Sequence, residues 1–286
     1  MTVIFVHPPK TAGSTIARIM DREYNPLYIC NIDGRFYYWS FERISGWPKE
    51  RLAKIKVFKG HMPFGLHTFL PQPSSYITIL RDPVNRTISE YHYRKHLRHP
   101  ILDRDAKTLT LEEYVTTVPY NNPQTKMIAG IRVPYQYHFY SVLSSYNLYT
   151  GPCTAETLEI AKANLSQYFS LIGLTERFDE TLALGKILFG WKIPFYISMK
   201  QGPKLTKKDD VSPRQRSLIA ECHQFDMELY RFAASLFDEA VAKHAERVSV
   251  ELDSVRHAKN SGAMHWTYHR IGAMFRRQFI RAHCAI

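Results

Sequence analysis

Residues 2–15 read TVIFVHPPKTAGST, and this segment carries the strongest structural signal in the chain. The first five residues form a continuous apolar run rich in β-branched side chains, which is typical of a strand buried in a parallel sheet. A loop follows, and a helical pattern then extends from Thr15 to Asp21. The segment therefore predicts a strand, a loop and a helix in succession.

The same alternation recurs further along the chain. Apolar runs at residues 55–59 (IKVFK), 76–80 (YITIL) and 168–173 (YFSLIG) each end at a glycine or a polar residue. Strands that alternate with helices indicate an α/β fold. We expect a P-loop-like, three-layer architecture in which helices flank a central, mainly parallel sheet. A capping box at Ser212 and Gln215 predicts a further, long amphipathic helix that runs to about Ala240.

The composition is that of a globular protein with a basic surplus. The chain has 286 residues, of which 45% are hydrophobic and 22% charged, so it can bury a sizeable core and is neither disordered nor fibrous. Lys and Arg number 38 against 26 Asp and Glu, which gives a net charge of +12. This surplus favours an anionic partner, namely a phosphorylated cofactor, an acidic polymer or a membrane surface.

Several features bear on location. No run of about 18 apolar residues occurs, and Met1 leads directly into the first strand rather than into a basic and then apolar leader. The four cysteines lie far apart without a C-x-x-C pair, which argues against a disulfide framework or a metal site. We expect a cytoplasmic protein with reduced thiols, no transmembrane segment and no bound metal.

No internal repeat or low-complexity linker marks a domain boundary. We therefore expect one domain over residues 1–250, followed by a basic and helical C-terminal tail over residues 251–286. From Ser254 onward this tail carries six Lys and Arg residues and no acidic residue. It could dock on the body of the protein, on a membrane surface or on an acidic acceptor.

The loop after the first strand has the composition of an anion site. It offers a cation, three hydroxyls and a glycine where a strand feeds a helix, so backbone N–H groups converge at the helix N-terminus. Its glycine follows the lysine, whereas a nucleotide triphosphatase loop reads G-x-x-x-x-G-K-[ST]. The residues concerned are Lys10, Thr11, Gly13, Ser14 and Thr15.

A second anion-binding pattern lies at residues 79–93, ILRDPVNRTISEYHY. Arg81 leaves the end of a predicted strand, Asp82 can cap the helix that follows, and Pro83 fits its first turn. Ser89 lies about two turns further along that helix. Because the Arg guanidinium offers parallel donors to an oxyanion, Arg81 and Ser89 are candidates to hold a second phosphate.

Together, the two segments resemble the nucleotide motifs of one enzyme family. HPPKTAGST, residues 7–15, resembles the 5′-phosphosulfate loop of sulfotransferases that use 3′-phosphoadenosine 5′-phosphosulfate (PAPS), and residues 79–93 resemble their 3′-phosphate motif. The similarity is greatest to carbohydrate enzymes such as the heparan sulfate 2-O- and 6-O-sulfotransferases. It continues through residues 121–130 (NNPQTKMIAG), 171–184 (LIGLTERFDETLAL) and 225–237 (FDMELYRFAASLF).

The resemblance implies roles for the matched positions. Arg81 and Ser89 would bind the 3′-phosphate, and a lysine-rich loop would close over the nucleotide through Lys200, Lys204 and Lys207. Lys10 would also neutralise the bridging oxygen as the S–O bond breaks. PAPS would be the cosubstrate and adenosine 3′,5′-bisphosphate the product, with no metal required. The 5′-phosphosulfate would be held by Lys10, Thr11, Ala12, Gly13, Ser14 and Thr15.

The acceptor hydroxyl needs a general base, and histidine suits this role near neutral pH. His61 follows a predicted strand end in residues 58–67, FKGHMPFGLH, and matches the histidine in the family's Gly-His segment. The family pattern has another histidine two residues earlier, where this chain has Lys59. His67 and His7 are the candidates to assist His61.

Three functional hypotheses follow. The first is sulfuryl transfer from PAPS to a hydroxyl, in line with the resemblance, and most simply to a carbohydrate hydroxyl. The second is a P-loop phosphotransferase that uses ATP, against which the glycine order counts. The third is a non-catalytic binder of acidic glycans or nucleic acid, although no nucleic-acid-binding signature is present.

Overall fold

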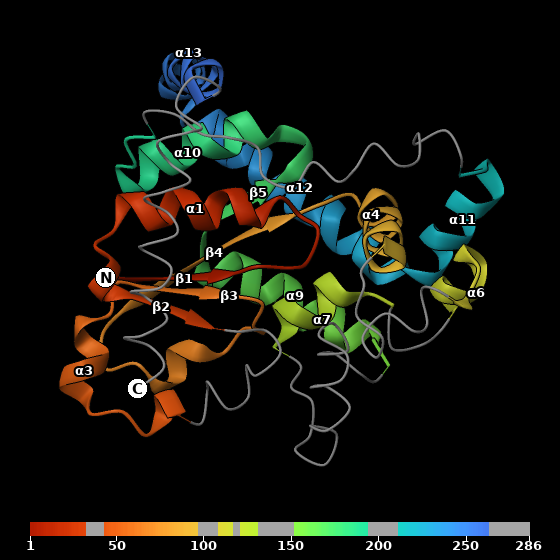
Figure 1. Ribbon diagram of the computed structural model, residues 1–286, viewed down its shortest axis with the longest axis horizontal. Coiled ribbons are helices and arrows are strands. Elements are labelled where there is room, and N and C mark those ends of the chain that lie inside the picture. Colours follow the sequence, from red (N-terminus) through yellow and green to blue (C-terminus); the bar gives the residue numbers. More distant parts are fainter. Residues whose placement is uncertain (33–42, 97–107, 117–120, 131–151, 194–210, 263–286) are drawn as a thin grey trace.

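The computed structural model describes residues 1–32, 43–96, 108–116, 121–130, 152–193 and 211–262 (Figure 1). Five strands form one sheet in the order β2-β3-β1-β4-β5, and every adjacent pair is parallel. The predicted α/β fold with a central parallel sheet is confirmed. The strands are β1 (Thr2–Val6), β2 (Ile29–Ile32), β3 (Val57–Gly60), β4 (Ser74–Leu80) and β5 (Phe169–Leu174).

Four of the five strands coincide with the predicted apolar runs, whereas β2 was not predicted. Its sequence, ICNI, spans only four residues and includes the exposed Asn31. A strand this short at the edge of a sheet shows too little alternation to be recognised from its own residues. Its position depends on pairing with β3, which lies on its inner side.

Helices cover both faces of the sheet and create the predicted three layers (Figure 1). One layer contains α1 (Gly13–Glu23) and α10 (Phe178–Phe189), and the opposite layer contains α7 (Pro123–Ala129) and α9 (Ala155–Tyr168). Helix α12 (Gln224–Lys243) packs against β5, α9 and α10. The other described helices are η1 (Pro26–Tyr28), α3 (Lys49–Lys54), η2 (Leu66–Phe69), α4 (Pro83–His96), α6 (Leu111–Thr116), η5 (Thr175–Arg177), α11 (Pro213–Cys222) and α13 (Ala245–Gly262).

The main hydrophobic core fills the space between the sheet and its helices. All five residues of β1 are buried, as expected for a central strand covered on both faces. A separate, smaller apolar cluster joins α4, α6 and α11 through residues such as Ile88, Tyr114 and Ile219. This second cluster holds α4 in place beside the sheet.

The C-terminal part of the chain continues the helical scaffold. Helix α13 crosses residue 250 without interruption and packs on α10. Residues 263–286, which make up most of the tail expected over residues 251–286, lie outside the part of the chain that the structure describes.

The long helix predicted from residue 213 to about Ala240 is two helices. The predicted capping box at Ser212 and Gln215 begins α11, but this helix ends at Cys222 and α12 begins at Gln224. Between them, His223 has φ −115° and ψ 32°, which lies outside the helical range. Its ring is fully buried and its Nδ1 accepts the backbone N–H of Asn122, 2.9 Å away, so a contact with a distant segment interrupts the helix.

The topology places two loops beside each other at one edge of the sheet. After β1 the chain turns towards β2 and β3, whereas after β4 it turns towards β5, although β1 and β4 are neighbours. In open parallel sheets, such a reversal leaves a crevice at the carboxyl ends of the two strands, where ligands bind. The loops that follow Val6 and Leu80 both start at this edge.

Two buried side chains, His223 at the helix break and Glu90 on α4, lead us to expect a loss of stability in acid. Burial and the nearby Arg86 lower the pKa of His223 to about 3, while Lys126 acts in the same direction and Glu90 against it. Burial alone would raise the pKa of Glu90, but Arg86 and Arg94 outweigh it and lower this pKa to about 2. Both groups bind protons more readily in the unfolded chain, so both destabilise the fold as the pH falls.

We expect the free energy of unfolding to decrease below about pH 6.5, by up to about 1.4 kcal/mol per pH unit from His223 alone. Glu90 adds to the decrease below about pH 4.5. Urea unfolding at a series of pH values measures this slope. His223→Gln should flatten it between pH 6.5 and 5, whereas His257→Gln, at an exposed position on α13, should not. An unchanged slope in His223→Gln would contradict the assignment.

Candidate active site

The loop between β1 and α1 holds two residues in left-handed backbone conformations. Lys10 has φ 71° and Ala12 has φ 62°, and neither is a glycine. Such conformations cost about 1–2 kcal/mol each and concentrate at functional sites. The Thr11 hydroxyl donates to the carbonyl oxygen of Pro8 at 2.8 Å and fixes the loop from inside. Ala12 is the N-cap of α1 and supplies no side-chain cap, and the Thr15 N–H donates to its carbonyl oxygen at 2.9 Å. No side chain of the cap therefore competes with an anion for the other backbone N–H groups of the first turn.

Gly13 makes room for a histidine ring at the start of α1. A Cβ at this position would lie 2.2 Å from His7 Cδ2 and 2.3 Å from His7 Nε2. Any larger residue would therefore displace the His7 ring. The glycine of the predicted phosphosulfate loop thus allows the loop and His7 to pack directly together.

His61 is in direct contact with His7. The two imidazole rings have their centroids 4.2 Å apart, and His61 Nδ1 is 2.6 Å from the His7 carbonyl oxygen. Because a carbonyl oxygen only accepts hydrogen bonds, Nδ1 of His61 carries the hydrogen, and in the neutral ring Nε2 is the basic nitrogen. The structure therefore brings the predicted base next to the predicted phosphosulfate loop.

The two other histidine candidates occupy different positions. His7 contacts His61 directly, as described above. His67 instead hydrogen-bonds through Nδ1 to the Tyr76 hydroxyl at 2.9 Å, and Tyr76 pairs with Ile4 in the interior of the sheet. Burial lowers the pKa of His67. Of the two, His7 is the one in contact with His61.

Lys59, which occupies the position of the second family histidine, contributes to the scaffold. Its side chain is buried, and Nζ lies 2.5 Å from Asp21 Oδ1 and 2.7 Å from the carbonyl oxygen of Ala17. Both partners belong to α1, so Lys59 links β3 to this helix. A lysine engaged in this way is not available as a base.

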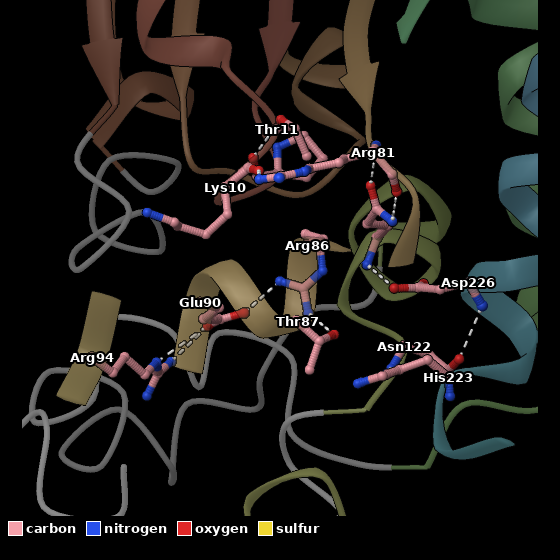
Figure 2. A network of polar contacts seen from close by, with 12 residues as sticks. Lys10, Thr11, Arg81, Arg86, Thr87, Glu90, Arg94, Asn122, His223 and Asp226 are labelled. Carbon is pink, nitrogen blue, oxygen red and sulfur yellow. Dashed lines mark hydrogen bonds and ion pairs between the residues drawn. The ribbon is translucent and has the colours of Figure 1, made fainter. Parts of the chain in front are cut away.

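Arg81 joins the second predicted motif to the first. Its Nη1 donates to the carbonyl oxygen of Lys10 at 3.1 Å, as Figure 2 shows. Burial lowers the pKa of the Arg81 guanidinium, since removal from water disfavours its charged form. The loops after β1 and β4 are therefore in direct contact, as the topology of the sheet suggests.

Helix α4 carries the remaining part of the second motif. Asp82 caps it by accepting the N–H of Asn85 at 2.8 Å, as predicted. The Lys10 side chain extends away from Arg81 (Figure 2), and its Nζ lies 4.1 Å from the centre of the Tyr93 ring. Ser89 is half-buried and precedes Tyr93 by four residues, so both occupy the same face of α4. The Lys10 ammonium thus reaches the face of α4 that carries Ser89.

The other arginine of this motif has a different environment. Arg86 is 1% exposed and contacts Glu90 and Thr87, and Glu90 also binds Arg94 (Figure 2). These three charged side chains therefore pair with one another within α4. Lys200, Lys204 and Lys207, the predicted covering lysines, lie outside the described residues.

Three residues beside the site make contacts that the sequence analysis did not predict. Gln124 binds the backbone of Arg81, Tyr93 lies under the Lys10 ammonium, and the His7 carbonyl orients His61. Gln124 and Tyr93 both lie in segments that resemble the sulfotransferase pattern, and this resemblance was the one feature of the sequence that could have pointed to them. Their contacts, however, depend on residues far away in the sequence.

A family model described as galactose-3-O-sulfotransferase matches residues 1–266. The chain belongs to this family. Among curated relatives, heparan-sulfate 6-O-sulfotransferase 2 of Danio rerio is 28% identical over 82% of this chain and 58% of its own length. Heparan-sulfate 6-O-sulfotransferase 1 of Cricetulus griseus is 27% identical over 83% of this chain and 67% of its own. The predicted resemblance to carbohydrate sulfotransferases is confirmed, although the chain spans only about three fifths to two thirds of these relatives.

The predicted cytoplasmic location is wrong. The heparan-sulfate 6-O-sulfotransferases that the chain resembles are Golgi-lumenal enzymes. Widely spaced cysteines indicate only that the fold does not depend on disulfide bonds. A core of this size is stable without disulfides both in the cytoplasm and in the Golgi lumen, so the cysteines do not reveal the location. Within the described residues, no helix combines the length and the apolar character that crossing a membrane requires.

The contacts of Lys59 lead to a test of its role. We expect Lys59→His, which restores the family residue, to lower the free energy of unfolding by about 1–3 kcal/mol because Asp21 loses its partner. Turnover should not increase. Chemical denaturation and a sulfuryl-transfer assay measure the two effects, and Asp21→Asn, which breaks the same contact from the other side, is the matched control. A faster Lys59→His enzyme would show that a second histidine assists catalysis.

Proposed function

We propose that this protein transfers a sulfuryl group from PAPS to a hydroxyl of a carbohydrate acceptor. The hydrogen bond between Arg81 Nη1 and the Lys10 carbonyl oxygen carries the proposal, because it joins the loop suited to one end of the nucleotide to the residue suited to the other. Membership of the galactose-3-O-sulfotransferase family supports the same reaction class.

The residues present fit the two anionic ends of PAPS. The phosphosulfate end would meet the backbone N–H groups, the hydroxyls and the Lys10 ammonium of residues 10–15. The 3′-phosphate would meet Arg81 and Ser89. Arg81 Nε is buried and has no hydrogen-bond partner among the described residues, so a phosphate oxygen would satisfy a donor that the fold leaves unpaired.

His61 acts as the general base in this proposal. With its Nδ1–H directed at the His7 carbonyl oxygen, Nε2 is the atom that removes the proton of the acceptor hydroxyl. The oxygen then attacks sulfur in line with the departing phosphate, the S–O bond to that phosphate breaks, and Lys10 with the loop amides stabilises the charge that develops there.

A glycan is the acceptor that the relatives favour. The family description names galactose, and the relatives named above act on heparan sulfate, so both point to a sugar hydroxyl. The net charge of +12 suits an acidic chain as the partner. Incubation with radiolabelled PAPS and a panel of acidic and neutral glycans identifies the acceptor by transfer of the label.

The identity of the nucleotide can be tested first. Adenosine 3′,5′-bisphosphate should raise the melting temperature in proportion to the logarithm of its concentration, because a ligand that binds only the folded state stabilises it. ATP with Mg²⁺ should produce a clearly smaller shift at the same concentration. Differential scanning fluorimetry makes the comparison, and a larger shift with ATP would favour a phosphotransferase instead.

The base assignment has its own test. His61→Ala should lower kcat by about 10²–10⁴-fold while the affinity for adenosine 3′,5′-bisphosphate stays near that of the parent protein. His67→Ala is the control, since His67 binds Tyr76 instead of the loop, and it should keep most of its turnover. Near-normal turnover of His61→Ala with intact nucleotide binding would exclude His61 as the base.

A further inference from the structure

The backbone of Arg81 is held by a side chain from a distant segment. Gln124 Oε1 accepts the Arg81 N–H at 3.0 Å, and Gln124 Nε2 donates to the Arg81 carbonyl oxygen at 2.9 Å. Because β4 ends at Leu80, the Gln124 amide takes the place that a neighbouring strand would occupy. Two hydrogen bonds to one residue fix both the position and the orientation of its backbone, from which the guanidinium extends.

Gln124 is itself held in place by Asp226 of α12. It is 1% exposed in the first turn of α7, and its backbone N–H donates to Asp226 Oδ2 at 3.2 Å. The N–H and the hydroxyl of Thr125 both donate to Asp226 Oδ1, at 2.7 and 2.8 Å. Asp226 belongs to α12 and is completely buried, so it caps α7 from another helix.

A reciprocal pair of contacts prevents α7 and α12 from sliding past each other. Asn122 Oδ1 accepts the backbone N–H of Asp226 at 2.9 Å, and His223 Nδ1 accepts the backbone N–H of Asn122. Figure 2 shows these residues as one series that leads from the start of α12 towards Arg81. The position of Arg81 is therefore set by the core helix α12 as well as by its own strand.

We propose that Gln124, anchored by Asp226, is a positioning residue that aims Arg81 at the 3′-phosphate of the nucleotide. The inference rests on the proposed function, since it assumes a nucleotide with a 3′-phosphate at Arg81. Neither Gln124 nor Asp226 needs to touch the ligand. Their effect passes through the Arg81 backbone to the guanidinium, which then binds the phosphate and the Lys10 loop together.

The inference predicts a loss of affinity that depends on the 3′-phosphate. Gln124→Leu removes both hydrogen bonds to Arg81 at similar volume. It should weaken binding of adenosine 3′,5′-bisphosphate about tenfold to hundredfold, which is typical when a residue that orients a binding group is lost. Binding of adenosine 5′-monophosphate should change less than about twofold. Isothermal titration calorimetry with both nucleotides measures the difference.

Asn164→Leu is the matched control for this substitution. Asn164 Nδ2 donates to the carbonyl oxygen of Ile128 at 2.9 Å, so it binds the other end of the same helix α7. The control removes an amide that binds a backbone carbonyl but does not touch Arg81, and it should leave the affinities for both nucleotides unchanged. Should Gln124→Leu not fold, Asp226→Asn, which keeps one acceptor oxygen, should produce a weaker loss with the same dependence on the 3′-phosphate.

A double-mutant cycle separates positioning from general damage. Arg81→Ala alone should weaken the bisphosphate selectively, and adding Gln124→Leu should cause no further loss, because residues that act through one another are not additive. Equal loss of both nucleotides in Gln124→Leu, or full additivity with Arg81→Ala, would overturn the inference. A parent protein that does not distinguish the two nucleotides would instead overturn the proposed function.

Discussion

The hydrogen bond from Arg81 Nη1 to the Lys10 carbonyl oxygen is the contact on which the candidate site depends. It joins two loops that leave neighbouring strands at the point where the chain reverses direction across the sheet. Parallel pairing of β1 with β4 places both loops at the same edge, and this hydrogen bond brings them into contact. The order of the strands in the sheet therefore sets how far apart the two proposed anion sites lie.

Several features around this contact lower the stability of the folded state. Lys10 and Ala12 adopt left-handed conformations, and the charges of Arg86, Glu90 and Asp226 are buried. Each buried charge has partners that reduce the cost of its removal from water. Burial of the large apolar core on both faces of the sheet offsets the cost of the strained backbone and the buried charges. Buried hydrogen bonds such as those from Gln124 and Thr125 to Asp226 hold the segments around the site in place.

The sequence predicted the local parts of this structure, and contacts between distant residues determined the rest. Four strands, the Asp82 cap and the capping box at Ser212 depend on near neighbours, and all of them were predicted. By contrast, the break at His223 depends on Asn122, 101 residues away, and Gln124 holds Arg81 across 43 residues. No local pattern encodes such pairs. The motifs led to Lys10, Arg81 and His61, whose roles in the reaction stay predictions.

A crystal structure of the protein with adenosine 3′,5′-bisphosphate would test the central claim most directly. The account predicts that a single nucleotide spans the crevice, with its 5′-phosphate at the backbone N–H groups of residues 11–15 and its 3′-phosphate within hydrogen-bond distance of the Arg81 guanidinium and the Ser89 hydroxyl. A nucleotide bound elsewhere, or one whose 3′-phosphate points away from Arg81 into solvent, would contradict it.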